Sequence, residues 1–328
     1  MTQHHLHLET SRKRPSHLHL ADALWHAAAA RHPELAKRLH VTIGWDGEIL
    51  EEALKTADFM INQNPPREGL RSRAPRLQWI QTTGAGLDAI LPLDWLPARI
   101  TLTNNRGAHG EKSEDSCTAA LLFIHTRLAE VIRNQREHVW KPLLTPPIVG
   151  LTAVVLGFGD LGQGAGRAAK KLGLRVIAVT RSGKAAPPAD EARPVSALDE
   201  VLPLADFFIV TTPLTAETRG LVDRRRVGLL KRGAGVINIA RAAIMDYEAL
   251  RERLEREELA GAVLDVFDPE PLPPDSPLWD TRNLLVTPHM SCDMPAYIER
   301  LLDFWFENFA RFLEGKPLVN AVDPARGY

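Results

Sequence analysis

The sequence predicts an α/β fold built on parallel, doubly wound sheets. Short apolar runs rich in Val and Ile alternate with helical patterns along most of the chain, as in proteins with strands and helices in βαβ order. A glycine-rich turn at residues 157–162 separates one such run from a helical pattern. The length of 328 residues, with 45% hydrophobic and 25% charged residues, suits one large or two medium globular domains.

The glycine turn lies inside a complete βαβ unit. Ala153–Leu156 is apolar and β-branched, which predicts a buried strand. The turn Gly157-Phe158-Gly159-Asp160-Leu161-Gly162 follows directly. Gly173 ends the next helix, and Val176–Val179 is a second buried strand. That helix is predicted from apolar residues at helical spacing: Leu161, Ala165, Ala168, Ala169 and Leu172.

Each glycine of the turn has a physical role in binding a dinucleotide. Gly157 permits the tight turn, Gly159 lets backbone approach a pyrophosphate, and Gly162 lets the helix pack closely on the strand. The N–H groups and the dipole at the start of the helix favour the anion. We therefore predict a dinucleotide site over residues 157–162. The alternative is a βαβ unit with a glycine turn and no ligand.

The residues after the second strand indicate which dinucleotide is expected. An acid at this point would bind the ribose 2′-hydroxyl, but the sequence is Thr180-Arg181-Ser182-Gly183-Lys184. Arg181 can bind a 2′-phosphate through its forked donors, and Ser182 and Lys184 can add a hydroxyl and a charge. We predict NADP, contacted by Thr180, Arg181 and Ser182, with NAD as the weaker alternative. A solvated basic loop without a ligand is the other interpretation.

The first hundred residues predict a small α/β unit of their own. Its expected strands are an edge strand near Leu6–Leu8, then Val41–Trp45, Phe59–Asn62, Gln78–Thr82 and Ile100–Thr103. Helices are expected near residues 21–32 and 48–57. His5-x-His7 and His17-x-His19 also occur here, but no cysteine or carboxylate pattern completes a metal site. We therefore predict no bound metal.

Two loops of this unit are candidate ligand sites. Asn62-Gln63-Asn64-Pro65-Pro66 leaves one strand end, where open α/β sheets bind ligands. Thr83-Gly84-Ala85-Gly86-Leu87-Asp88 leaves the next strand, and its glycines would let successive N–H groups face one carboxylate. Either loop could equally be an ordinary turn.

The later chain predicts one long helix and then further alternation. The long helix runs from Ser113 to about His138, with Ser113 as N-cap, before Thr145-Pro146-Pro147 breaks the chain. Buried strands follow at Phe207–Val210, Val236–Ile239, Ala262–Val266 and Leu284–Val286, with helices near 196–202 and 247–258. A final helix over 295–314 carries an apolar stripe, which favours a core or a subunit interface.

Three polar residues follow these later strands. Arg241 comes just after one strand, Glu270 lies in a Pro-flanked loop after the next, and His289 follows the last. Because the carboxyl ends of parallel strands share one edge of a sheet, we expect the three side chains to converge. Arg can hold a carboxylate, His can move a proton, and Glu can orient and charge the His. The alternative is that all three merely cap strand ends.

Together these motifs resemble the D-isomer-specific 2-hydroxyacid dehydrogenase family over nearly the whole chain. The matching segments are the GFGDLG turn, residues 213–220 (PLTAETRG), NIAR at 238–241, LDVFDPEPLP at 264–273 and VTPH at 286–289. The resemblance implies hydride transfer between NADP(H) and C2 of a small 2-keto or 2-hydroxy acid. It implies Arg241, Glu270 and His289 as catalytic residues. The further cofactor contacts that it implies are Thr212, Pro213, Ile239, Ala240 and Asp265.

The resemblance also implies the domain organisation and the substrate site. A flavodoxin-like substrate domain, residues 1–104 and 291–328, would contain an inserted Rossmann domain, residues 105–290. A homodimer built partly with the Ser113 helix is expected. Substrate contacts are expected at Asn64, at the carboxylate loop Gly84, Ala85 and Gly86, and at Arg241 and His289. Glyoxylate, hydroxypyruvate and bulkier 2-keto acids all remain open as substrates.

The sequence departs from the family pattern at three places. Ala242 replaces a frequent Gly, Asp115 a common Glu, and Met290-Ser291-Cys292 the usual small residues after the His, which puts the pocket wall there in question. A nucleotide-sensing corepressor that binds peptides is one alternative function on this fold. Phosphite or formate oxidation is another.

Composition excludes several classes of partner. The formal net charge of −1 gives no general attraction to nucleic acid or anionic membrane. No apolar run reaches the ~20 residues that span a bilayer, and the N-terminus has no apolar signal core. Two cysteines, Cys117 and Cys292, make no disulfide framework. We therefore expect a cytoplasmic location.

Overall fold

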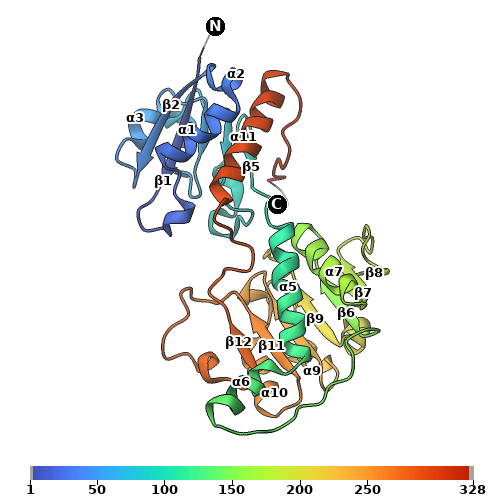
Figure 1. The fold of residues 1–328 in the computed structure, drawn as a ribbon. Helices are drawn as coiled ribbons and strands as arrows, with labels where there is room; N and C mark the ends of the chain where they lie inside the picture. Colours follow the sequence, from blue (N-terminus) through green and yellow to red (C-terminus); the bar gives the residue numbers. More distant parts are fainter. Residues whose placement is uncertain (1–2, 325–328) are drawn as a thin grey trace. The chain divides into compact units, whose positions relative to one another are not determined.

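The computed structural model describes residues 3–324 and divides them into two compact units. One unit contains the described residues up to Ala108 together with those from Met294 onward, and the other spans His109–Asp293. Each unit has one sheet in which all paired strands are parallel (Figure 1). The predicted fold class, two parallel-sheet α/β domains, is confirmed.

The five-stranded sheet of the first unit has the order β2-β1-β3-β4-β5, the strand order of flavodoxin-like sheets. Its strands are β1 (His4–Thr10), β2 (Leu39–Trp45), β3 (Phe59–Ile61), β4 (Trp79–Gln81) and β5 (Thr101–Thr103). The predicted edge position of Leu6–Leu8 is wrong, because β1 pairs with both β2 and β3. Its residues His5 and His7 are buried and hydrogen-bonded.

These β1 histidines bond to neighbouring side chains. His5 Nδ1 lies 2.9 Å from Thr56 Oγ1, and His7 Nε2 lies 2.9 Å from the Glu9 carboxylate. Thr42 Oγ1 lies within 2.9 Å of both rings. Burial and the nearby His40 and His7 lower the pKa of His5. The buried polar groups therefore satisfy one another within the sheet.

Helices cover both faces of this sheet. On one face α1 (Asp22–Arg31) and α11 (Tyr297–Leu313) pack against Leu6, Leu8 and Phe59. The apolar stripe predicted for the final helix lies in this core, with Ile298, Leu301, Leu302, Trp305, Phe306 and Phe309 all buried. On the other face, Leu54 of α3 (Leu50–Leu54) and Leu70 of α4 (Leu70–Arg73) share a core with Met60 and Ile80. The four-residue helix α2 (Pro33–Ala36) follows α1.

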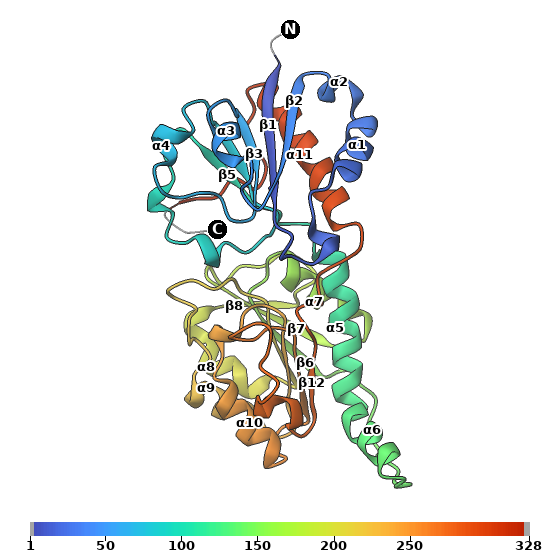
Figure 2. The same cartoon turned by 90° about the vertical axis from the view of Figure 1, so that its left-hand side faces the viewer.

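The seven-stranded sheet of the second unit has the order β12-β11-β10-β9-β6-β7-β8. From β8 to β11 this is the Rossmann order 3-2-1-4-5-6, and β12 extends it. Figure 2 labels β6, β7, β8 and β12 of this sheet. The strands are β6 (Thr152–Leu156), β7 (Arg175–Thr180), β8 (Glu191–Pro194), β9 (Phe207–Val210), β10 (Gly235–Asn238), β11 (Gly261–Leu264) and β12 (Leu284–Val286). The short edge strand β8 was not predicted, since its Glu, Arg and Pro residues carry no apolar pattern.

Helices also cover both faces of the seven-stranded sheet. The helices α5 (Gly110–His125) and α7 (Asp160–Lys171) pack on one face. The helices α8 (Leu198–Val201), α9 (Arg224–Leu229) and α10 (Tyr247–Glu255) pack on the other. The 3₁₀ turns of both units are η1 (Ser16–Leu18), η2 (Asp88–Ile90), η3 (Leu93–Trp95), η4 (Val195–Ala197), η5 (Leu202–Leu204), η6 (Ala242–Ile244) and η7 (Pro277–Asp280).

The predicted long helix from Ser113 to His138 is two helices. The first, α5, begins at Gly110, and α6 (Leu128–Arg136) follows a break at Arg127, whose φ is 56°. Ser113 is therefore inside α5 and is not an N-cap, and its Oγ donates to Gly110 O. A Cβ on Gly164 of α7 would come within 2.0 Å of Ser113 Oγ. Close packing of α5 on α7 explains the small residues at this crossing.

Within residues 3–324, no helix combines the length and the apolar character that a membrane span requires.

Candidate active site

The predicted site residues of the second unit lie at the carboxyl ends of its strands. Because β6, β7, β9, β10, β11 and β12 are parallel neighbours, these ends share one edge of the sheet. The glycine turn follows β6, Arg181 follows β7, and Thr212 and Pro213 follow β9. Arg241, Glu270 and His289 come after β10, β11 and β12 respectively.

The glycine turn has the geometry expected of a pyrophosphate cradle. Gly157 has φ +85°, and a Cβ there would lie 2.7 Å from the Thr212 backbone. A Cβ on Gly162 would lie 2.2 Å from Gly157 O, so the helix can approach the strand only without a side chain. A Cβ on Gly159 would meet no protein atom within 4 Å. The residues thus leave space for an anion at the N-terminus of α7 and fit a dinucleotide.

Other residues fix this turn. Thr211 Oγ1 donates to Gly157 O at 2.7 Å and to Leu156 O at 3.2 Å. The sequence motifs indicated its neighbour Thr212 and did not predict this contact. The carboxylate of Asp160 accepts from the N–H of His109 at 3.2 Å, at the start of α5. The Asp160 side chain is therefore engaged at the start of α5, and the cofactor contact expected of Asp160 stays a prediction.

The segment after β7 is polar and solvent-accessible. Arg181 and Ser182 are exposed, and Thr180 is half-buried with its Oγ1 donating to Lys184 O at 2.9 Å. This bond fixes the path of the loop that follows the strand. The residues sit beside the glycine turn because β7 pairs with β6.

The structure brings Glu270 and His289 into contact. His289 Nδ1 lies 2.7 Å from Glu270 Oε2, and Phe267 N–H donates to Glu270 Oε1 at 2.8 Å. The carboxylate is thus held on both oxygens. The side chains are 35% and 47% exposed for Glu270 and His289, so the pair can reach a reactant while Nε2 of the imidazole points away from Glu270.

Asp265 supports the loop that carries His289. Its Oδ1 accepts from Thr287 Oγ1 (2.6 Å) and Met290 N–H (3.0 Å), and its Oδ2 accepts from Ser291 N–H (3.0 Å). His289 itself has the left-handed φ of 49°, which a non-glycine residue keeps only when its surroundings enforce it. The buried carboxylate of Asp265 is thus engaged within the protein, and the cofactor contact expected of Asp265 stays a prediction.

The two cysteines lie near this carboxylate. Burial, with the charge of Asp265, raises the pKa of the Cys117 thiol to about 12. The same two causes raise the pKa of Cys292. Because a thiolate is the reactive form of cysteine, neither residue is suited to act as a nucleophile.

Arg241 lies at the next strand end. Its backbone is extended at the start of η6, and its Nη1 donates to Ala240 O at 2.7 Å. Ala240 and Ile239, the expected cofactor contacts, are buried at the end of β10. The preceding Asn238 Nδ2 donates to Arg241 O at 3.1 Å. This asparagine, which the sequence reading did not single out, fixes the turn that presents Arg241.

The predicted loops of the first unit follow β3 and β4. Asn64 N–H donates to Asn62 Oδ1 at 2.8 Å, so the first loop is a compact Asx-type turn. Gln63 Oε1 accepts from Gly84 N–H and Thr83 Oγ1, both at 2.7 Å. A carboxylate would therefore displace Gln63 or use the amides of Ala85 and Gly86. This contact between the two loops could not be predicted from the glycine pattern.

Comparisons with known proteins agree with this architecture. Residues 118–291 match the family model described as D-isomer specific 2-hydroxyacid dehydrogenase, NAD binding domain. Glyoxylate reductase of Korarchaeum cryptofilum is 28% identical over 287 residues, covering 84% of this chain and 86% of that protein.

Two crystal structures resemble the whole chain. A D-isomer specific 2-hydroxyacid dehydrogenase from Xanthobacter autotrophicus, in complex with NADPH and MES, is 30% identical with a TM-score of 0.85. It covers 98% of this chain and 99% of its own. NADPH-dependent glyoxylate/hydroxypyruvate reductase from Sinorhizobium meliloti, in complex with NADP and sulfate, is 26% identical with a TM-score of 0.83. It covers 99% of this chain and 100% of its own.

Proposed function

The chain belongs to the D-isomer-specific 2-hydroxyacid dehydrogenase family, and we propose that it reduces small 2-oxo acids to 2-hydroxy acids with NADPH. The observation that carries the proposal is the contact of 2.7 Å between His289 and Glu270, at the sheet edge that also holds Arg241 and the glycine turn. Such a pair suits proton transfer to a carbonyl oxygen. We assign nucleotide binding to the unit His109–Asp293 and substrate-loop contacts to the other unit.

NADP is proposed as the cofactor because no acid follows β7. Arg181 offers a forked cation for a 2′-phosphate, whereas a carboxylate at this point would repel one. Two similar structures contain NADPH or NADP, which supports the same choice. When bound, NADPH supplies the hydride for the carbonyl carbon. Residues 157–162 would hold the pyrophosphate, and Thr212, Pro213, Ile239 and Ala240 would contact other parts of the cofactor.

The residues of the second unit then divide the chemistry. His289, protonated, donates a proton from Nε2 to the carbonyl oxygen as negative charge grows there. Glu270 accepts from Nδ1, fixes the orientation of the ring and favours its charged form. Arg241 pairs with the substrate carboxylate and helps to polarise the carbonyl. Asn64 and the amides of Ala85 and Gly86 are the proposed substrate contacts of the first unit.

Glyoxylate and hydroxypyruvate are the proposed substrates. Relatives named glyoxylate reductase, and one named NADPH-dependent glyoxylate/hydroxypyruvate reductase, support this size class. Met290 replaces a small residue directly after His289 and so changes the expected pocket wall. Bulkier 2-oxo acids are therefore included in the same assay, to measure how much space this wall leaves.

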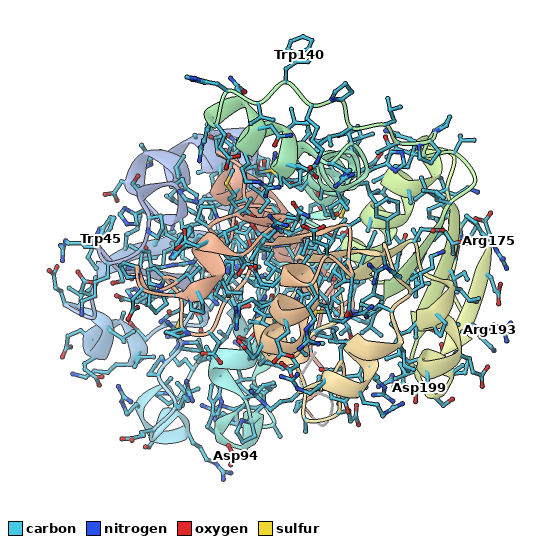
Figure 3. The ribbon with its side chains drawn as sticks, turned by 90° about the horizontal axis from the view of Figure 1, so that it is seen from below. Trp45, Asp94, Trp140, Arg175, Arg193 and Asp199 are labelled. Carbon is cyan, nitrogen blue, oxygen red and sulfur yellow. The ribbon has the colours of Figure 1, made fainter. Side chains whose placement is uncertain are left out.

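A homodimer is also proposed, because α6 exposes apolar side chains and buries a charged one. Leu128, Val131 and Ile132 are 39–42% exposed, whereas Glu130 of the same helix is buried and pairs with Arg127 and Lys141 (3.1 Å). An apolar face turned to solvent beside a buried carboxylate is typical of a subunit interface. Nearby, Trp140 is 97% exposed and its ring stands clear of the chain (Figure 3). A second copy would cover this surface.

A substrate panel tests the proposal. Glyoxylate, hydroxypyruvate and larger 2-oxo acids are assayed with NADPH and NADH by absorbance of the reduced nicotinamide. We expect the highest kcat/KM with NADPH and one of the two small acids. Binding of NADPH without turnover of any 2-oxo acid would contradict the proposed reaction and favour a binding protein on the same fold.

A further inference from the structure

The side chain of Asn238 closes the turn that leads to Arg241. It is fully buried at the end of β10. Its Oδ1 accepts from Ala240 N–H at 3.0 Å, and its Nδ2 donates to Arg241 O at 3.1 Å. The same Nδ2 donates to the hydroxyl oxygen of Tyr247 at 2.9 Å. The turn that presents Arg241 is therefore bonded to the first residue of α10.

The Tyr247 hydroxyl continues this path to the other two candidate catalytic residues. Its O–H donates to Val266 O at 3.0 Å, just beyond β11. The next residue, Phe267, donates its N–H to Glu270 Oε1 at 2.8 Å, and Glu270 Oε2 lies 2.7 Å from His289 Nδ1. One path of hydrogen bonds and a single peptide unit thus joins Arg241 to the Glu270–His289 pair through one phenol.

The surroundings of Tyr247 make its hydroxyl bond important for the loop. An open surface pocket of about 540 Å³, lined by Tyr247, Ala242, Phe267 and Leu272 among others, lies beside the loop that carries Glu270. The loop therefore borders solvent on that side, and its hydrogen bonds contribute to its position. Burial raises the pKa of the Tyr247 phenol, so it keeps its proton and remains a donor over the whole range of enzyme assays.

We propose that Tyr247 is a positioning residue that couples the orientation of Arg241 to that of the Glu270–His289 pair. The proposal rests on the function proposed above. The Tyr247 hydroxyl donates to Val266 O and accepts from Asn238 Nδ2 at the same time. It thereby fixes the position of Arg241, which would bind the carboxylate, relative to His289, which would donate the proton. Loss of this link would loosen both strand ends together.

Tyr247→Phe is the variant that tests this role, because it deletes one oxygen and keeps the ring. We expect kcat/KM for the best 2-oxo acid to fall about 5- to 30-fold, with KM raised and kcat lowered. The Kd for NADPH should stay within twofold. The pH profile of reduction should move to lower pH, since a looser Glu270 supports protonated His289 less well. In a Glu270→Gln background, Tyr247→Phe should shift the profile no further.

The matched control is Trp279→Phe. Trp279 Nε1 donates to Pro273 O at 2.8 Å in the same stretch of chain but outside the path, and this variant should keep wild-type kinetics. Unchanged KM, kcat and pH profile in Tyr247→Phe would overturn the inference and leave the proposed function intact. An equal loss in Trp279→Phe would also overturn it, because any loosening of the loop would then suffice.

A second measurement is independent of turnover. Hydrogen exchange of the Phe267 amide reports whether its bond to Glu270 persists. We expect at least ~10-fold faster exchange in Tyr247→Phe with unchanged global unfolding. If the wild type reduced no 2-oxo acid, the proposed function would fail on its own. Equal Phe267 exchange in the two proteins would then refute the positioning role.

Discussion

Among substitutions in the glycine turn, Gly159→Ala should weaken cofactor binding with the smallest effect on the stability of the fold. Gly159 is the N-cap of α7, with φ −74° and ψ −155°, a backbone conformation open to alanine. An added Cβ would meet no protein atom within 4 Å. The unfolding free energy should therefore fall by about 0.5–1 kcal/mol, the difference between glycine and alanine as N-cap.

The same methyl group would occupy space proposed for the pyrophosphate. Intrusion of one methyl group into a close-packed contact costs ~1–3 kcal/mol, which corresponds to a rise in the Kd for NADPH of about 5- to 150-fold. The Kd can be measured by nicotinamide fluorescence, and stability by urea unfolding of the same samples.

Two further glycines are the controls. Gly162→Ala would place a Cβ 2.2 Å from Gly157 O, so it should lower the unfolding free energy by ~1–3 kcal/mol as an overpacked site. Gly228→Ala in α9 also meets open space, and it should raise stability by about 0.5–1 kcal/mol without affecting NADPH. A Gly159→Ala protein that bound NADPH within twofold of wild type would refute the proposed cradle.

Three other substitutions test the remaining proposals. Arg181→Ala should lower kcat/KM with NADPH by about 10- to 150-fold, the value of one charge-assisted contact, and leave NADH unaffected; better use of NADH by the wild type would contradict the cofactor proposal. Glu270→Gln should still bind substrate but move the pH profile of reduction to lower pH, because a neutral partner no longer favours protonated His289; an unmoved profile in an active variant would remove that assignment. Ile132→Lys should give a monomer in sedimentation experiments, whereas Leu204→Lys, at a residue 50% exposed on η5, should not; a wild-type monomer would exclude the proposed interface.

Several features could be predicted because they depend on neighbours in the sequence. The glycine turn, its flanking strands and the helix that follows are local, and the structure has them at β6, α7 and β7. The positions of Arg241, Glu270 and His289 after successive strands could also be predicted. Parallel strands place such residues on one sheet edge by geometry alone, although their catalytic roles stay predictions.

Sequence reasoning failed where a distant contact overrides local pattern. Nothing near Arg127 signals the end of α5, since the break has no glycine or proline and its φ of 56° depends on tertiary surroundings. Ser113 looked like an N-cap but lies inside the helix against Gly164. The segment Leu6–Leu8 was predicted as an edge strand, yet pairing with both β2 and β3 makes β1 internal.

The sequence by itself therefore determined the α/β class, the nucleotide-type turn and the family, because these follow from periodicity, glycine spacing and ordered motifs. Only the tertiary structure decided which groups hold those motifs in place. Gln63 accepts a hydrogen bond from the Gly84 amide, and the Thr211 hydroxyl donates one to Gly157 O. The Tyr247 hydroxyl bonds to both Asn238 and Val266. Such contacts join residues that lie up to 54 positions apart, and each depends on strand order and side-chain direction, which no local pattern encodes.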